Sequence, residues 1–455
     1  MENLILYHST NKKAPLATFA EALLKGLAPD KGLFMPEYIP VLSKDEISSF
    51  KNMPYYEIAF TIIKQYLKGQ IPDEALLGMV KDAYDFEIPL ELVCDRKYIM
   101  RLDQGPTASF KDFAARMMGQ LMQYFLGKEN RKLLILTATS GDTGSAIANA
   151  FYELDNINVL VLYPEEEVTD MQRKQMTTLG KNIKIISLDG KFDDCQAMVK
   201  EAFMDKEIED LNLSSANSIN IGRLIPQIVY FFYSYSRLCN NENESVVFSV
   251  PSGNFGDMMG GVLAMHMGLP VKKFIIATNK NDEFPKYLNT GIYSPIDSSI
   301  NCISSAMNVG HPSNIARLVE IYNGEMDEKG RIIKDADLLK MRKQIWSTSV
   351  TDTETKATIY DAWKDHKLLL EPHGAVAWEG LKKYIEAHPE DNTKDQLFIS
   401  LETAHPAKFP EEIKKILNID PELPESLKGI ESRPESFIKM ENDYEAFKLF
   451  LKANY

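Results

Sequence analysis

Short apolar runs that alternate with helical patterns are the feature that most constrains the fold of this chain. Six runs rich in β-forming residues read as buried strands, at 133–136, 159–162, 183–187, 246–250, 274–277 and 397–401. Helical patterns separate most of them, and strands connected through helices pair in parallel while the helices cover the sheet. The pattern therefore predicts an α/β protein with buried parallel sheets.

Composition limits the class of protein that this chain can be and the cell compartment in which it is expected. The 455 residues carry a formal net charge of −14, which argues against a nucleic-acid-binding surface. The four cysteines are far apart, and the seven histidines show no metal-ligand spacing, so no metal site is expected. The N-terminus lacks a signal-peptide pattern, and no apolar run reaches the roughly 18 residues that span a bilayer. We expect a cytoplasmic protein with no membrane partner.

Three of the predicted strands end in polar loops that lead into helices, at 137–144, 251–257 and 402–409. Ligands of open α/β sheets bind at the carboxyl ends of the strands, so these loops should converge on one crevice. The backbone N–H groups of TSGDTG (139–144) suit a carboxylate, and those of PSGNFGD (251–257) suit a phosphate. Each loop taken alone is equally consistent with a plain β-to-α turn.

Lys111 stands at the start of an amphipathic helix predicted within 105–126. Thr107 or Ser109 would cap this helix, which places Lys111 in the first turn, where the helix dipole lowers an amine's pKa. Such an amine can be deprotonated for attack on a carbonyl. The alternative interpretation is a solvated surface lysine.

A second polar segment, NSINIGR (217–223), supplies Asn217, Ser218 and Arg223. An arginine fork with neighbouring hydrogen-bond donors is a suitable site for a phosphate monoester. A capped helix start with a surface arginine is the alternative. Thr403 and His405, after the last predicted strand, could likewise serve only as helix-start residues.

Taken together, these segments resemble the threonine synthase family, pyridoxal-phosphate enzymes of fold type II in the tryptophan synthase β-chain superfamily. The resemblance extends over nearly the whole chain, through YHST (7–10), DKGLFMP (30–36), SFKD (109–112), TATSGDTG (137–144), NSINIGR (217–223), PSGNFGD (251–257), EPHGAV (371–376) and TAHPAKF (403–409). It implies two three-layer αβα domains around a cofactor cleft, plus an N-terminal α-rich domain.

The resemblance also assigns roles to residues. It implies that Lys111 forms the Schiff base with pyridoxal 5′-phosphate and is the catalytic residue, and that Thr403 faces the pyridine nitrogen. The other cofactor-binding residues that it implies are Asp142, Gly253, Asn254, Phe255, Gly256 and Asp257. The implied substrate is O-phospho-L-homoserine, bound by Thr139, Ser140, Gly141, Thr143, Asn217, Ser218 and Arg223. The implied reaction is γ-elimination of phosphate followed by β-addition of water, which gives L-threonine in a carbon–oxygen lyase reaction.

Asp142 and Asn11 depart from the pattern of the family. The superfamily often has Asn facing the 3-oxygen of the cofactor, and an ionised Asp142 would repel that phenolate, so Asp142 is either protonated or points elsewhere. Related sequences often have arginine where this chain has Asn11, so Lys12 or Lys13 could substitute for it.

Two other functions remain open at this point. A phospho-lyase would bind the same substrate and release 2-oxobutyrate, and a non-catalytic homologue would lack activity although it keeps the lysine and the phosphate loop. The fold is also shared by serine and threonine dehydratases, cysteine synthase and tryptophan synthase β chains, because loops select the substrate.

Three domains are expected: 1–95, α-rich; 96–222, with the Schiff-base lysine; and 223–455, with the phosphate loop and a mostly helical insertion near 283–344. The final segment, from residue 417, is expected to pack on the N-terminal domain. The protein would be a monomer or a homodimer.

Overall fold

Two separate β-sheets organise the chain. The computed structural model describes residues 4–139, 141–241, 244–296 and 298–455. The larger sheet has six strands in the order β13 (Ile345–Ser349), β10 (Val271–Thr278), β9 (Val246–Pro251), β14 (Leu397–Glu402), β4 (Lys97–Arg101) and β3 (Leu90–Cys94). The smaller has five, in the order β15 (Ile438–Glu441), β7 (Ile183–Asp189), β6 (Ile157–Pro164), β5 (Leu133–Ala138) and β8 (Leu213–Ser214).

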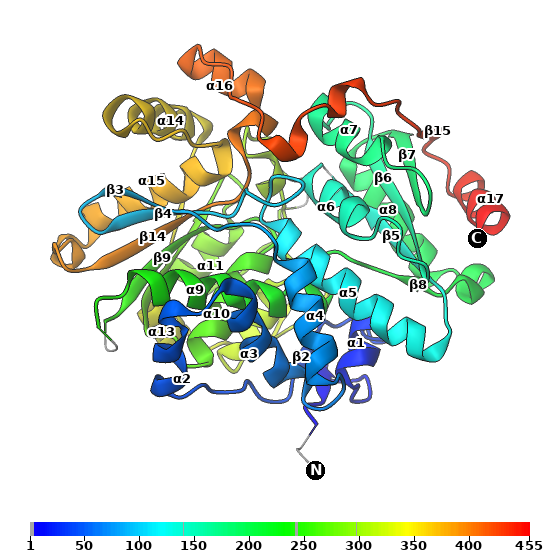
Figure 1. Ribbon diagram of the computed structural model, residues 1–455, viewed down its shortest axis with the longest axis horizontal. Helices are drawn as coiled ribbons and strands as arrows, with labels where there is room; N and C mark the ends of the chain where they lie inside the picture. Colours follow the sequence, from blue (N-terminus) through cyan, green and yellow to red (C-terminus); the bar gives the residue numbers. More distant parts are fainter. Residues whose placement is uncertain (1–3, 140, 242–243, 297) are drawn as a thin grey trace.

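Every strand pair in the two sheets is parallel except β3 with β4. All six predicted strands are present, and the two sheets form the separate lobes seen in Figure 1. The predicted α/β class with parallel sheets is therefore confirmed.

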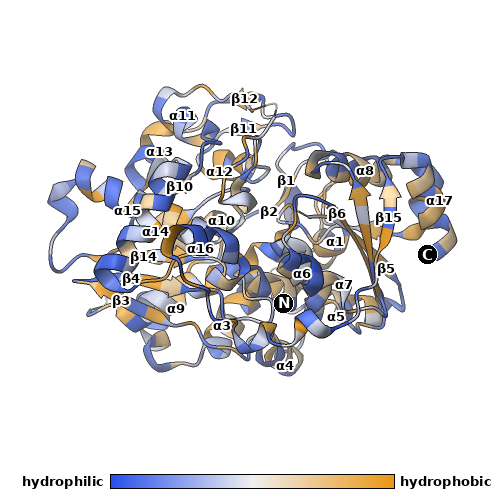
Figure 2. Cartoon of the chain, turned by 90° about the horizontal axis from the view of Figure 1, so that it is seen from above, coloured by the Kyte–Doolittle hydropathy of each residue, from blue (hydrophilic) through white to orange (hydrophobic). Residues whose placement is uncertain are grey.

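Alternate residues of the five-stranded sheet enter two different cores, because successive side chains of a strand point to opposite faces. Ile135 and Val161 pack in the central core, with α5 (Lys111–Glu129) and α6 (Asp142–Ala150). Leu136 and Leu160 pack in the outer core, with α8 (Phe192–Met204) and α17 (Tyr444–Asn454). Figure 2 shows these strands as strongly hydrophobic between the helical layers.

The six-stranded sheet is covered on both faces in the same way. Phe248 and Phe274 face the central core, where the Phe231 ring of α9 (Ile228–Leu238) lies 5.0 Å from the Phe248 ring. The glycine-rich helix α10 (Gly256–His266) packs on this face too. Val247 and Ile275 face the opposite core, which α14 (Asp352–His366) and α15 (Pro372–Ala387) close.

The N-terminal part is helical and joins the central core. It contains the antiparallel strand pair β1 (Tyr7–Ser9) and β2 (Phe34–Pro36), and the helices α1 (Phe19–Lys25), α2 (Lys44–Ser49), α3 (Tyr55–Leu67) and α4 (Asp73–Ala83). The Tyr55 ring of α3 lies 5.7 Å from Phe113 of α5 and 5.4 Å from Tyr233 of α9. These contacts fix the N-terminal helices beneath both lobes (Figure 1).

Two segments lie in a different part of the fold from the one in which the expected domain boundaries placed them. Strand β4 lies in the six-stranded sheet, although 96–222 was expected to form the other domain. The last strand, β15, pairs with β7, and α17 packs on α8, so the C-terminal segment covers the five-stranded lobe. Its expected packing on the N-terminal domain is wrong, because Phe447 and Leu451 fill the outer core of that lobe instead.

The expected helical insertion is only partly helical. It contains α11 (Glu283–Thr290), α12 (Ile315–Ile321), α13 (Leu338–Gln344) and the antiparallel pair β11 (Glu325–Met326) and β12 (Ile332–Lys334). The remaining helices of the chain are α7 (Asp170–Thr177) and α16 (Pro410–Leu417), with several single 3-10 turns between elements. Among the described residues, no helix is both long and apolar enough to cross a membrane.

Candidate functional site

Lys111 is the first residue of α5 and is buried, with 9% of its surface exposed. The interpretation as a solvated surface lysine is therefore wrong. Neither Thr107 nor Ser109 caps the helix, which begins after Phe110 without a side-chain cap. Instead, the Asp112 carboxylate accepts hydrogen bonds from the backbone N–H (2.8 Å) and the hydroxyl (2.6 Å) of Thr107. This contact folds the preceding loop back onto the helix and fixes where Lys111 starts.

The Lys111 amine points toward α6, where its Nζ lies 3.9 Å from Asp142 Oδ2. Burial lowers its pKa, the nearby cations Lys408 and Arg223 lower it further, and Asp142 and Asp257 oppose them. The direction agrees with the expectation from the sequence, but the first cause is burial rather than the helix dipole.

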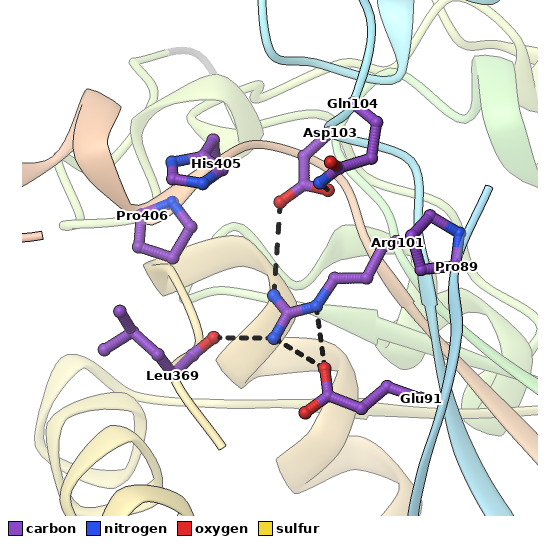
Figure 3. Close-up of a pocket in the computed structure, with 8 residues that line it drawn as sticks. All are labelled: Pro89, Glu91, Arg101, Asp103, Gln104, Leu369, His405 and Pro406. Atoms are coloured by element: carbon purple, nitrogen blue, oxygen red, sulfur yellow. Dashed lines mark hydrogen bonds and ion pairs between the residues drawn. The ribbon is translucent and has the colours of Figure 1, made fainter. Parts of the chain in front are cut away.

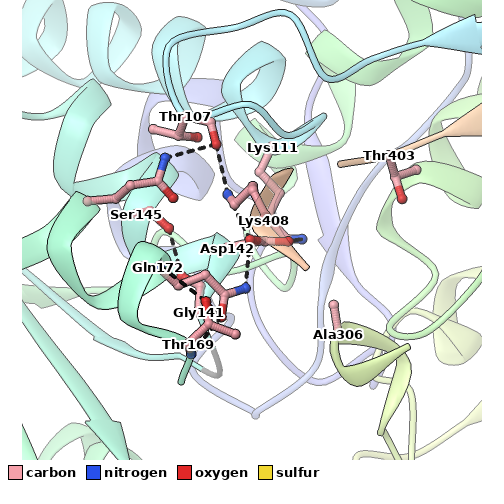
Figure 4. Close-up of polar contacts among 12 residues, drawn as sticks. Thr107, Lys111, Gly141, Asp142, Ser145, Thr169, Gln172, Ala306, Thr403 and Lys408 are labelled. Atoms are coloured by element: carbon pink, nitrogen blue, oxygen red, sulfur yellow. Dashed lines mark hydrogen bonds and ion pairs between the residues drawn. The ribbon is translucent and has the colours of Figure 1, made fainter. Parts of the chain in front are cut away.

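Asp142 begins α6 and is held by two further side chains (Figure 4). Its Oδ1 accepts from Lys408 Nζ at 2.8 Å and from Gln172 Nε2 at 2.9 Å. Burial alone would raise the pKa of Asp142, but Lys408, Lys111 and the hydrogen bonds outweigh it and hold the pKa well below its usual range. The lowered pKa favours the ionised carboxylate over the protonated form, and the carboxylate does not point elsewhere but faces two lysines.

The rest of the 139–144 loop is shaped by its own hydrogen bonds. Thr139 Oγ1 accepts from the backbone N–H groups of Gly141 (3.0 Å) and Gly144 (2.8 Å), so this side chain stabilises the turn. Gly141 has φ 132°, and a Cβ there would lie 2.4 Å from Gln172. Thr143 makes no side-chain hydrogen bond within the part of the chain that the structure describes. Ser140 lies outside the described residues.

The 251–257 loop leads into the N-terminus of α10, where the first N–H groups of a helix have no partner inside it. Phe255 has φ 63°, which turns the chain into the helix. A Cβ on Gly253 would lie 2.8 Å from Ala306 O and 2.8 Å from Met307 Cα, so only glycine fits beside the 305–307 turn. A Cβ on Gly256 would lie 3.2 Å from Ser218. These features form a close-fitting backbone cradle suited to an anion.

The 217–223 segment lies against this cradle. Asn254 Nδ2 donates to Ser218 Oγ at 2.6 Å, and Asn254 Oδ1 accepts from Ser313 N at 2.6 Å. The buried Arg317 guanidinium donates to the carbonyl oxygens of Ser218 (3.2 Å) and Ile219 (2.7 Å). The structure therefore brings two predicted binding segments together through the 313–317 turn, which the sequence analysis did not identify.

Arg223 is buried and forms no ion pair with a carboxylate among the described residues. Its Nη1 donates to Ala216 O at 2.7 Å, and its Nε has no hydrogen-bond partner among them. Burial lowers the pKa of the guanidinium to about 10, so it remains a cation at neutral pH. Asn217 Oδ1, on the same segment, is also buried and unpartnered. A buried cation with an unused donor is suited to an anionic ligand, and the alternative of a surface arginine is wrong.

Asp257 lies in the first turn of α10, after β9, and Thr403 directly follows the neighbouring strand β14. Burial raises the pKa of Asp257 to about 7. Thr403 Oγ1 lies 3.5 Å from Glu371 Oε1, and the other oxygen of Glu371 lies 2.5 Å from His373 Nδ1. His373 Nε2 accepts from Ala306 N at 3.0 Å, so its proton is on Nδ1. Thr403 is therefore joined through Glu371 and His373 to the turn beside Gly253.

His405, two residues further along, is a helix-start residue, as its alternative interpretation predicted. Its Nδ1 accepts from Ala407 N at 3.1 Å, and burial, Arg101 and Lys408 lower its pKa to about 4. Thr403, in contrast, caps no helix.

A cavity of about 370 Å³ opens beside His405 and is separate from the Lys111 cluster (Figure 3). The Arg101 guanidinium is prominent in it, but Glu91 Oε2 accepts from its Nε at 3.0 Å and Leu369 O accepts from its Nη2 at 3.1 Å. Glu402 Oε1 lies 3.5 Å from Nη1. This arginine is thus neutralised internally. In the described ranges, no group of His, Cys, Asp and Glu side chains could hold a metal ion.

Besides the 313–317 segment, three further residues of the site were missed from sequence: Lys408, Gln172 and Glu371. Lys408 and Glu371 stand in the segments TAHPAKF and EPHGAV, but no spacing rule shows which side chains of these segments point inward. Gln172 follows the helix-start residue Thr169, so from sequence it reads as a partner in a capping box.

Comparisons with known proteins agree with this site. Family models match residues 6–84 (threonine synthase N terminus), 89–400 (pyridoxal-phosphate dependent enzyme) and 375–451 (threonine synthase, C-terminal). A threonine synthase of Haemophilus influenzae is 40% identical over 435 residues, covering 95% of this chain and 96% of that protein.

Solved structures agree as well. The PLP-bound threonine synthase of Brucella melitensis has a TM-score of 0.91 and 34% identity, with 99% of each chain covered. The threonine synthase of Escherichia coli has a TM-score of 0.88 and 36% identity, with 99% of this chain and 100% of that chain covered. The chain therefore belongs to the threonine synthase family of fold type II pyridoxal-phosphate-dependent enzymes.

Proposed function

We propose that this chain is a threonine synthase, which converts O-phospho-L-homoserine and water to L-threonine and phosphate with pyridoxal 5′-phosphate as cofactor. One observation supports this most directly: the buried, partly unpartnered Arg223 cation lies near the buried amine of Lys111. An enzyme for a phosphorylated amino acid needs both groups in one site, a cation for the phosphate and an amine for the chemistry.

The residues present fit the cofactor. The cradle at Gly253, Asn254, Phe255 and Gly256 excludes a Cβ beside the 305–307 turn and presents helix N-terminal N–H groups, which suit its phosphate. Lys111 would hold its carbonyl carbon, and Thr403 and Asp142 would lie near its ring. When bound, the cofactor stores electrons released from substrate carbon atoms.

Lys111 has the properties required for proton transfer. Because burial favours its neutral form, the amine can accept the proton of the substrate α-carbon, and once it has passed that proton on it can accept one from the β-carbon. Asp257 lies close enough to influence the pKa of Lys111, and a carboxyl group with a pKa of about 7 can exchange protons near neutral pH.

The substrate's two anionic ends would occupy two separate parts of the site. Arg223, Asn217 and Ser218 would bind the phosphate, and Arg223 would keep this leaving group in place. Thr139, Gly141 just before α6, and Thr143 in its first turn would lie near the α-carboxylate. Ser140, for which the resemblance implies the same role, lies outside the described residues. We further propose a cytoplasmic enzyme that is a monomer or a homodimer and belongs to the carbon–oxygen lyases.

The test is an assay of purified protein with pyridoxal 5′-phosphate and O-phospho-L-homoserine, in which phosphate, threonine and 2-oxobutyrate are measured together. Equal amounts of phosphate and threonine, absent in Lys111→Ala, are expected. Phosphate with 2-oxobutyrate would identify a phospho-lyase instead. Absence of phosphate would contradict the substrate assignment.

A further inference from the structure

Lys408 is a buried cation of the site to which the proposed reaction assigns no part. It follows β14, and its side chain is fully buried, with 0% exposed. Its Nζ lies 2.8 Å from Asp142 Oδ1 and donates to Thr107 O at 2.7 Å. A buried lysine is costly unless it is paired, so its position calls for a physical reason.

Rigid partners hold Lys408 in place. The Thr107 carbonyl also accepts from Gln175 Nε2 at 3.1 Å, and Asp112 holds the N–H and hydroxyl of the same residue. Lys408 therefore reaches Asp142 from a fixed anchor on the loop that precedes Lys111. Figure 4 shows the side chains of Lys408 and Lys111 meeting the same carboxylate.

Asp142 is not shared equally between the two lysines. Its Oδ1 lies 2.8 Å from Lys408, whereas its Oδ2 lies 3.9 Å from Lys111, beyond hydrogen-bond distance. Gln172 donates to the same Oδ1 at 2.9 Å, so two donors hold the carboxylate by the oxygen that is farther from Lys111. A carboxylate freed from them could approach Lys111 and favour its protonated form.

We propose that Lys408 is a positioning residue, which keeps Asp142 ionised and holds it away from the Lys111 nitrogen so that this nitrogen can lose its proton near neutral pH. The proposal deepens the proposed function and rests on it in one respect, namely that Lys111 carries the cofactor. It also explains how an aspartate can stand where the superfamily often has an asparagine, because Lys408 neutralises its charge.

Other charged groups face this cluster and are not substituted in the test. Arg223 lowers the pKa of Lys111 and Asp257 raises it. Lys408 lowers the pKa of both Asp112 and His405. The substitutions must therefore leave these four residues unchanged.

The test is a pH titration of the visible absorption of the protein loaded with pyridoxal 5′-phosphate, which reports the protonation of the Lys111 nitrogen. We expect Lys408→Gln to raise the midpoint by about one pH unit, a tenfold change in the proton equilibrium. Lys408→Arg keeps the charge and should leave the midpoint near that of the unsubstituted protein.

A second background separates action through Asp142 from direct repulsion between the two lysines. In Asp142→Asn protein, adding Lys408→Gln should shift the midpoint by no more than about one third of the shift that it causes when Asp142 is present. An unchanged midpoint in Lys408→Gln, or equal shifts in the two backgrounds, would overturn the proposal.

If the Lys408→Gln single variant does not fold, the double variant with Asp142→Asn is used in its place, because it is neutral at both positions. This double variant is then compared with Asp142→Asn alone. Similar midpoints support action through Asp142, and a tenfold difference overturns it. If the unsubstituted protein develops no visible band with the cofactor, the proposed function itself is contradicted, whereas a normal band that is insensitive to Lys408 contradicts only this inference.

Discussion

Glu371 Oε1 lies 3.5 Å from Thr403 Oγ1, and the same carboxylate caps the helix that covers the six-stranded sheet. It accepts from the backbone N–H groups of His373 (2.8 Å) and Gly374 (2.9 Å) at the start of α15. The residue that orients the Thr403 hydroxyl is thus fixed by the N-terminus of a helix. The orientation of the Thr403 hydroxyl and the capping of α15 thus involve the same side chain.

Glu371→Ala should destabilise the protein by about 2–4 kcal/mol, since it removes a helix cap and leaves the buried His373 Nδ1 without its acceptor. Urea denaturation would measure the change. Glu371→Gln keeps an acceptor oxygen and should lose less. An alanine variant as stable as the unsubstituted protein would show that the carboxylate does not cap α15 in solution.

Gly253→Ala should disrupt the backbone cradle. The new Cβ would meet Ala306 O and Met307 Cα, each at 2.8 Å, and backbone atoms cannot move aside easily. We expect a loss of about 1–3 kcal/mol in stability and weaker binding of pyridoxal 5′-phosphate. Thermal unfolding and cofactor titration would measure both.

The matched control is Gly78→Ala in the middle of α4, where a Cβ would have no neighbour within 4 Å. Alanine favours helix over glycine by up to about 1 kcal/mol, so this variant should be as stable or more stable. Equal effects at the two glycines would argue against a special role for the cradle.

Arg223→Met should weaken substrate binding without lowering the stability of the protein. Loss of the guanidinium removes charged hydrogen bonds to the substrate phosphate, each worth about 1.5–3 kcal/mol, so KM should rise about 10- to 100-fold. Stability should stay the same or increase, because an unneutralised buried cation disappears. Steady-state kinetics and urea denaturation would test this, with the exposed Arg433→Met as control. An unchanged KM would place the phosphate elsewhere.

Asp257 should make stability depend on pH. Its pKa is about 7 in the folded protein and near 4 when unfolded, so between these values the folded state binds the extra proton. Asp257 therefore makes its full contribution to the free energy of unfolding below about pH 4. This contribution falls by up to about 4 kcal/mol as the pH rises toward 7. Asp257→Asn should flatten this slope in cofactor-free protein, whereas Asp155→Asn at an exposed site should not. Parallel pH profiles for unsubstituted and Asp257→Asn protein would refute the assignment.

Local pattern was sufficient to predict much of the fold. The apolar runs that became β5, β6, β7, β9, β10 and β14 are buried on both faces over most of their length, so each contains a mainly hydrophobic run that can be recognised in isolation. Strands β3 and β15, at sheet edges, are partly exposed and mixed in composition, and their pairing depends on distant partners. For that reason the predicted domain boundaries missed where the chain crosses between sheets.

Within the site, the sequence by itself determined which residue types are present: the lysine at the start of an amphipathic helix, the glycine-rich turns after strands, and the arginine beside polar neighbours. These depend on chemistry and local spacing. Only the tertiary structure decided that Lys408 neutralises Asp142, that Glu371 holds Thr403, and that Arg317 joins the two anion-binding segments. Each of these contacts joins residues from 32 to more than 260 positions apart in the chain, and the ionised state of Asp142 depends on such distant partners, so no local pattern encodes them.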